Sequence, residues 1–337
     1  MLLQTTWYVL IGVLLGGYAV LDGFDLGVGI LYPFLARNES ERKALRHAIG
    51  PVWDGNEVWL LTGGGALFAA FPLVYATVFS GLYLALMLVV FGLIFRAVSL
   101  EFRARDEAWA GVWDRAFFFG SAVPALLFGV AVGNMVRGIP LDAQGLFAGT
   151  FFTLLNPYAL LIGCLGFVMF ISHGAAWAAL KTEGVLRQRA VQVRSVTHWT
   201  FLALLGVATL VTANTLPDTF GRVITGAPGW AMLTVLALGV VYARLAMKRD
   251  SDAGAFAGSG LGILALVGLW FAGNFPTLVP SLGDGARSLT MANASSSSLA
   301  LTIMLVIAVI GMPLVLGYTY LVYRVFAGKV HEEDTGY

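Results

Sequence analysis

The stretch GYAVLDGFDLGVGILYPFL, residues 17–35, reads as a membrane-crossing helix that carries two charges. It has the length of a span, which takes about 20 apolar residues, yet Asp22 and Asp25 interrupt it. A carboxylate that faces lipid costs roughly 2.5–3.5 kcal/mol. The two aspartates are three residues apart and share one helix face, so we expect that face to meet protein or water. Gly23 and Gly27 mark an adjoining face on which another helix can approach closely.

The whole chain has the composition of an integral membrane protein. Of its 337 residues, 58% are hydrophobic and only 12% are charged, whereas soluble domains contain about 25% charged residues. The net charge of +1 argues against nucleic acid as a partner, because nucleic-acid binders carry a strongly basic face. The first apolar run has no basic segment before it, so we expect a retained span rather than a signal peptide.

Apolar windows of about 20 residues predict nine transmembrane helices. They fall near residues 7–33, 51–74, 77–99, 115–136, 151–180, 196–216, 228–247, 255–276 and 298–325. Barrel strands would instead alternate in polarity at every second residue. The predicted fold class is therefore an all-α integral membrane protein with nine spans.

Basic residues are distributed unequally between the two sides of these spans. All but Arg137, Arg222 and Arg287 of the 20 lysines and arginines lie in or beside the loops that follow odd-numbered helices, or in the C-terminal tail. Loops rich in lysine and arginine remain in the cytoplasm. The distribution predicts an N-terminus outside and a C-terminus in the cytoplasm, as an odd number of spans requires.

Acidic residues gather at the cytoplasmic side of the first three predicted spans. The second span begins with IGPVWDGNEVWL, which places Asp54 and Glu57 in its first turns. Asp54 is open to two interpretations, a capping acid favoured by the helix dipole or a group on a proton path. The third span ends with FGLIFRAVSLEFRAR, which places Arg96 and Glu101 at a similar depth. Arg96 either extends to the interface or neutralises one of the acids, and the line of carboxylates suits proton uptake.

His173 is the one histidine deep enough in a predicted span to be a membrane-embedded haem ligand. No histidine or methionine partner for it is evident, so a hydrogen-bonded structural histidine, or one that faces a partner, is favoured over haem ligation. By itself the sequence shows polar groups for conduction or packing, without a reaction centre.

Several long motifs are similar to subunit II of the cytochrome bd-type quinol oxidases. They include GYAVLDGFDLGVG, GPVWDGNEVWL, WDRAFFFGSAVPALLFGVAVGN, LLNPYALLIG, FPTLVPS and LTMANASSSSLALTIML, in order along nearly the whole chain. The resemblance implies a bacterial inner-membrane complex that oxidises quinol, reduces dioxygen to water and takes protons from the cytoplasm. It also implies two four-helix bundles, residues 1–137 and 138–276, followed by a peripheral helix and tail, residues 277–337.

The resemblance further implies what the chain binds. Haems b and d belong to the larger subunit I in this family, so this chain is expected to hold no haem or metal and to form a heterodimer with subunit I. Quinol is the substrate of the complex. Some members hold a structural quinone or lipid in the second bundle, and some contain a small accessory subunit.

The family's proton route uses acids of the smaller subunit, and the matching positions are Asp25, Asp54 and Glu101, with Asp22 beside them. Under this hypothesis Asp25 and Asp54 relay protons and Glu101 collects them near the surface. Arg96 would tune the proton affinity of these acids.

The resemblance also bears on other residues near that route. Asn56 would hydrogen-bond along it, and Glu57 occupies a position that can be glutamine in the family. An oxygen path is implied near Trp59, and Trp53 and Trp59 either line these routes or simply pack the core.

Two other functions remain open on the residues alone. Buried acids and glycine-rich spans are also found in stand-alone proton-coupled transporters, although those usually interrupt paired helices at the midplane. A purely structural scaffold for a larger subunit is the other alternative.

Overall fold

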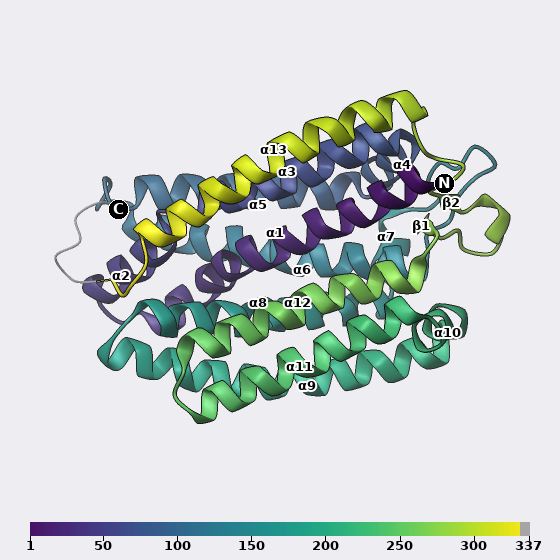
Figure 1. Cartoon of the computed structure of the whole chain (residues 1–337). Coiled ribbons are helices and arrows are strands. Elements are labelled where there is room, and N and C mark those ends of the chain that lie inside the picture. Colours follow the sequence, from purple (N-terminus) through teal and green to yellow (C-terminus); the bar gives the residue numbers. More distant parts are fainter. Residues whose placement is uncertain (331–337) are drawn as a thin grey trace.

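The computed structural model describes residues 1–330 and consists mainly of long helices that run side by side (Figure 1). The helices are α1 (Leu2–Leu35), α2 (Glu39–Ile49), α3 (Trp53–Ala70), α4 (Pro72–Gly81), α5 (Tyr83–Phe102), α6 (Ala110–Arg137), α7 (Phe151–Leu154), α8 (Pro157–Lys181), α9 (Gly184–Thr215), α10 (Pro217–Thr225), α11 (Ala227–Lys248), α12 (Asp252–Asn274) and α13 (Ser298–Val325). Strands β1 (Thr277–Val279) and β2 (Leu289–Thr290) form a small antiparallel pair. The helical class is therefore confirmed, with this one short hairpin added.

Within residues 1–330, eight helices are long and apolar enough to cross a membrane, namely α1, α5, α6, α8, α9, α11, α12 and α13. The helix that corresponds to the second predicted span is α3, which has 18 residues and lies beside α1 and α13. Its 18 residues extend over about 27 Å at 1.5 Å per residue. Its first turns contain Asp54, Asn56 and Glu57, so α3 is more polar than the eight apolar helices.

Several predicted boundaries differ from the structure. The 77–99 span begins at Tyr83, since residues 77–81 belong to α4, and the 196–216 span begins at Gly184. Proline accounts for two further differences. The predicted 51–74 span ends at Ala70, because Phe71 leaves the helical conformation and Pro72 begins α4. The predicted 151–180 span is divided into α7 and α8, because the side chain of Asn156 caps α8 by accepting from the Ala159 N–H and Pro157 occupies the first helical position. Proline suits that position since its missing N–H would have no partner there.

Helix α1 is central, since it packs against α3, α6, α8 and α12. The glycine face predicted on α1 is confirmed at Gly27, where the backbones of α1 and α8 touch. A Cβ atom at Gly27 would lie 2.8 Å from the Gly174 Cα and even closer to the Phe170 carbonyl oxygen. Gly23 meets the ring of Phe170 instead. The close approach places the acidic segment of α1 inside the bundle.

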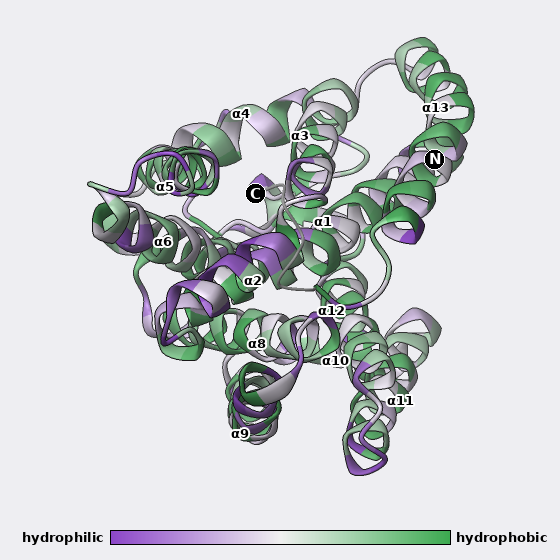
Figure 2. Ribbon diagram, turned by 90° about the vertical axis from the view of Figure 1, so that its left-hand side faces the viewer, coloured by the Kyte–Doolittle hydropathy of each residue, from purple (hydrophilic) through white to green (hydrophobic). Residues whose placement is uncertain are grey.

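The outer surfaces of the bundle are apolar, whereas the most polar helix, α2, lies across one end (Figure 2). On α5, for example, Leu84, Leu88, Phe91 and Phe95 recur at helical spacing and are each about half exposed. The C-terminal end of α13 lies at the same end as α2, and β1 and β2 lie at the other (Figure 1). The connections rich in lysine and arginine lie at the α2 end.

Candidate functional site

Four helices bring polar side chains together inside the bundle, toward its α2 end. Asp22 and Asp25 of α1 and Arg96 of α5 are completely buried, and Asn56 of α3 is 2% exposed. Tyr323, near the end of α13, completes the group. We call these residues, with Glu57 of α3, the carboxylate network.

Arg96 joins two of the acids. Its Nη2 donates a hydrogen bond of 2.7 Å to Asp22 Oδ1 and forms a second ion pair with Glu57 Oε1. The side chain of Arg96 is therefore directed into the protein, which confirms neutralisation and excludes extension to the interface. A buried arginine without partners would be costly, so Asp22 and Glu57 are required for Arg96 to lie here.

Asn56 links the remaining acid to α13. Its Nδ2 donates to Asp25 Oδ2 at 2.7 Å and to the Leu21 carbonyl at 3.1 Å. Its Oδ1 accepts from the Tyr323 hydroxyl at 2.9 Å. Tyr323 escaped the sequence analysis because the 298–325 segment reads as a uniformly apolar span. A buried tyrosine hydroxyl needs a hydrogen-bond partner, but Tyr318 and Tyr320 lie in the same segment, so the sequence did not single out Tyr323.

The two aspartates each keep an oxygen that accepts nothing from residues 1–330. These atoms are Asp22 Oδ2 and Asp25 Oδ1. Buried oxygens are usually hydrogen-bonded. Each carboxylate can therefore take up a proton without breaking a contact that the structure shows.

Asp54 and Glu101 lie outside this network. Asp54 is exposed on α3, one turn before Glu57, and Glu101 is partly exposed on α5, five residues beyond Arg96. Neither makes a hydrogen bond or ion pair within the described part of the chain. The structure thus gathers five of the seven predicted residues, Asp22, Asp25, Asn56, Glu57 and Arg96, and leaves two acids nearer the surface of the chain.

Both predicted tryptophans are packed in the core at 8% exposure. Trp59 lies against Gly17 of α1, where an added Cβ would contact its indole ring, and clusters with Leu14 and Tyr18. Trp53 belongs to a separate cluster at the α2 end. Trp59 therefore packs beside Tyr18, one helical turn before Asp22 on α1.

His173 has the structural environment favoured by its sequence. It is fully buried on α8, with Nε2 3.0 Å from the Val20 carbonyl and Nδ1 2.6 Å from the Ser259 hydroxyl. Because a carbonyl can only accept, Nε2 carries the proton. Both ring nitrogens of His173 are used in joining α8 to α1 and α12.

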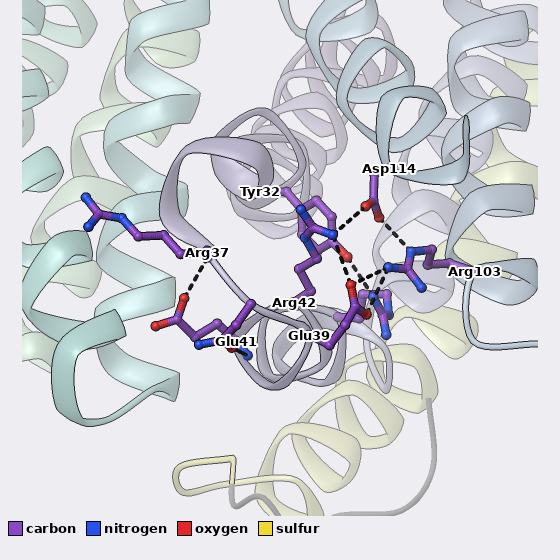
Figure 3. Close-up of polar contacts among 9 residues, drawn as sticks. Tyr32, Arg37, Glu39, Glu41, Arg42, Arg103 and Asp114 are labelled. Atoms are coloured by element: carbon purple, nitrogen blue, oxygen red, sulfur yellow. Dashed lines mark hydrogen bonds and ion pairs between the residues drawn. The ribbon is translucent and has the colours of Figure 1, made fainter. Parts of the chain in front are cut away.

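A second group of charges lies at the α2 end, where α2 crosses the helix ends (Figure 3). Arg103, just after α5, donates to Asp114 of α6 at 2.7 Å and to Glu39 of α2 at 2.7 Å. Arg42 of α2 pairs with the same two acids, at 2.9 Å from Glu39 and 3.2 Å from Asp114. These four residues tie α2 to the α5–α6 connection.

We expect Glu39→Gln to lower stability by less than about 1 kcal/mol, because the Glu39 side chain is 62% exposed and such pairs are screened by water. Burial opposes the shift, but hydrogen bonds and charge from Arg42 and Arg103 lower the pKa of Glu39 overall. The contribution is therefore complete above the ordinary glutamate pKa and disappears as the pH falls through the lowered value. Thermal unfolding of both proteins as a function of pH would check this, and a gap that persists in acid would contradict it.

The fold and the network define an all-helical, multi-span membrane protein with a buried carboxylate–arginine cluster near one end. The sequence model of the family described as cytochrome bd terminal oxidase subunit II matches residues 3–326. The chain belongs to this family and is a subunit of a respiratory quinol oxidase, which implies a partner subunit I.

Individual members of this family are similar to the chain over nearly its full length. The chain is 38% identical to the cytochrome bd-I ubiquinol oxidase subunit 2 of Escherichia coli strain K12, over 98% of this chain and 96% of the relative. It is 36% identical to the cytochrome bd ubiquinol oxidase subunit 2 of Bacillus subtilis, over 99% of both. A chain in the structure of bd oxidase from Geobacillus thermodenitrificans has the same fold, with a TM-score of 0.80 at 16% identity, over 97% of this chain and 99% of that one.

Proposed function

We propose that this chain supplies the cytoplasmic proton inlet of the oxidase, next to a subunit I that holds the haems. The observation that carries the proposal is the buried carboxylate network, in which Asp22 and Asp25 each keep an oxygen that accepts nothing from residues 1–330. Intramembrane acids that face the interior mark proton paths in general. Asp54 and Glu101 would collect protons near the surface, and Asp25 would pass them inward.

The orientation of the chain supports this direction of transfer. The network lies toward the α2 end, where the lysine- and arginine-rich connections are found, and the positive-inside rule assigns that end to the cytoplasm. The N-terminus of α1 is then outside the bacterial inner membrane. Protons drawn from the cytoplasm for dioxygen reduction would thereby contribute to the proton motive force.

The remaining parts of the proposal concern architecture and ligands. Residues 1–137 and 138–276 would form the two four-helix bundles, with α13 and the tail as the peripheral element. Haems b and d would belong to subunit I alone, and an oxygen path would pass Trp59. A structural quinone or lipid in the second bundle, and a small accessory subunit, would be additional ligands and partners.

A structural scaffold is the main alternative to an inlet. The ion pairs of Arg96 favour the scaffold, because they join α1, α3 and α5 and so hold the bundle together. Asp25, in contrast, makes no ion pair among residues 1–330. It accepts from Asn56, whose amide oxygen accepts from Tyr323, and a scaffold has no need of a carboxylate there. A stand-alone transporter is excluded by membership in the oxidase family.

Asp25→Asn in the assembled complex is the decisive test. We expect oxygen consumption per haem to fall roughly tenfold or more, since a positioned proton donor typically contributes 10²–10⁴-fold. Assembly and the haem spectrum should be unchanged, because asparagine keeps the shape and the acceptor oxygen toward Asn56.

Asp218→Asn is the matched control, since Asp218 is exposed in the first turn of α10, at the opposite end of the bundle. Asp54→Asn should show a smaller loss than Asp25→Asn, because Asp54 is exposed and water can replace it. Normal turnover in the Asp25 variant would reject the inlet and leave the scaffold.

A further inference from the structure

Helix α13 is attached to the rest of the chain by few contacts along its length. Leu301 is its one buried residue, and it packs against α1 and α3. Near its beginning the Trp7 indole N–H donates to the Leu301 carbonyl at 3.0 Å. Near its end Tyr323 donates to Asn56. The position of Tyr323 must therefore be fixed largely by whatever holds that end of α13.

The segment after α13 binds the turn between α8 and α9 through four hydrogen bonds. Lys181 Nζ donates to the carbonyls of Phe326 at 2.5 Å and Gly328 at 3.2 Å. In return, Lys329 Nζ donates to the Thr182 carbonyl at 2.7 Å, and the Val330 N–H donates to the Lys181 carbonyl at 2.8 Å. We call this reciprocal arrangement the tail clamp.

Trp177 of α8 connects the tail clamp to Tyr323. The ammonium of Lys181 lies 5.1 Å from the centre of the Trp177 ring, a cation–π distance. The Tyr323 ring meets the same indole edge to face, with centroids 6.1 Å apart. The indole N–H of Trp177 donates to the Ala48 carbonyl and so fixes the ring. Tyr323 and the Lys181 ammonium of the clamp thus lie against the same fixed indole ring.

The donors and acceptors around Asn56 fix the orientation of its amide group and therefore the effect of Tyr323 on it. The Leu21 carbonyl can only accept, so the Asn56 atom that faces it is the NH₂ group. Both N–H bonds of Asn56 are then used, by Leu21 and Asp25, and the amide oxygen faces Tyr323. An amide that accepts at its oxygen becomes a better donor at its nitrogen, since hydrogen bonds in a chain polarise one another.

We propose that the tail clamp and Tyr323 form a positioning arm, which strengthens and orients the hydrogen bond that Asn56 donates to Asp25. This inference rests on the proposed role of Asp25 in proton uptake. Tyr323 is a positioning residue, since it acts on Asp25 through Asn56. The C-terminal tail thereby affects a carboxylate on the first helix of the chain.

The first test is Tyr323→Phe in the complete oxidase, which removes the hydroxyl and keeps the ring against Trp177. Turnover per haem should fall about threefold to tenfold, the effect of leaving one buried acceptor without its donor. The ratio of turnover in H₂O to that in D₂O should rise, because proton delivery becomes a larger part of the rate. Tyr320→Phe is the matched control, since Tyr320 is 66% exposed on the same helix.

The second test addresses the clamp and the route of the effect. Lys181→Met keeps the apolar stem over Trp177 and should raise the isotope ratio in the same direction, whereas Lys248→Met, at the exposed end of α11, should not. In an Asp25→Asn background, Tyr323→Phe should cause no further loss if it acts through Asp25.

The outcomes separate this inference from the inlet itself. Normal turnover in Asp25→Asn would reject the inlet. Suppose that Asp25→Asn is impaired but Tyr323→Phe has the same rate and isotope ratio as Tyr320→Phe. That result would overturn the positioning arm and leave the inlet standing. A full additional loss in the double variant would likewise overturn it, because Tyr323 would then act independently of Asp25.

Discussion

Replacing Arg96 with methionine should cause the largest loss of stability of any single change in the carboxylate network. Arg96 and Asp22 are both completely buried, so the change leaves two acids facing each other without a cation. Removing one partner of a buried ion pair typically costs 3–5 kcal/mol, against a total stability of about 5–15 kcal/mol for a native protein. We expect little assembled oxidase, measured as haem recovered with the complex and as a lower unfolding temperature.

The control for Arg96 is Arg105→Met, because Arg105 is exposed beyond the end of α5 and surface changes are usually within about 0.5 kcal/mol. Removing the two acids as well, in Asp22→Leu, Glu57→Gln and Arg96→Met combined, should restore much of the stability, since the uncompensated charge is gone. Equal unfolding temperatures for the Arg96 and Arg105 variants would show that the ion pairs do not hold the helices together.

Gly27→Ala should be nearly as damaging, although it adds a single methyl group. The new Cβ would overlap the backbone of α8 at Phe170 and Gly174, and backbone cannot rotate aside as a side chain can. Overpacking usually costs 1–3 kcal/mol, and we expect about 3 kcal/mol here because α1 and α8 must separate. The separation would also displace Asp25, two residues away, so both the unfolding temperature and the turnover should fall.

Gly65→Ala is the matched control for Gly27, since Gly65 lies within α3 with nothing within 4 Å of an added Cβ. Alanine is the better helix former by about 1 kcal/mol, so Gly65→Ala should be neutral or slightly stabilising. If Gly27→Ala behaved in the same way, the close contact of α1 and α8 would not be a constraint on the fold.

Several features of the fold follow directly from local sequence. The apolar windows predicted the long helices, and α13 begins and ends at the predicted residues 298 and 325. Windows of hydropathy were less reliable where a helix was interrupted, at Phe71 and Asn156. Those interruptions depend on a proline at the following position and on a capping side chain, which an average over 20 residues does not register.

The candidate site, like the fold, was predicted in part from the sequence. The sequence identified Asp22, Asp25, Glu57 and Arg96 as polar groups at a common depth, because helical rise converts residue number into depth. Depth alone left open which acid Arg96 would neutralise, and the structure shows that it binds two of them.

The sequence by itself determined that this chain spans a membrane many times, that its basic connections share one side, and that its acids lie toward that side. These properties depend on residues close together along the chain. Only the tertiary structure decided that Tyr323 bonds to Asn56, 267 positions away, and that the tail reaches the α8–α9 turn. Such pairings depend on how the helices pack and rotate against one another, and the periodicity of the local sequence does not predict them.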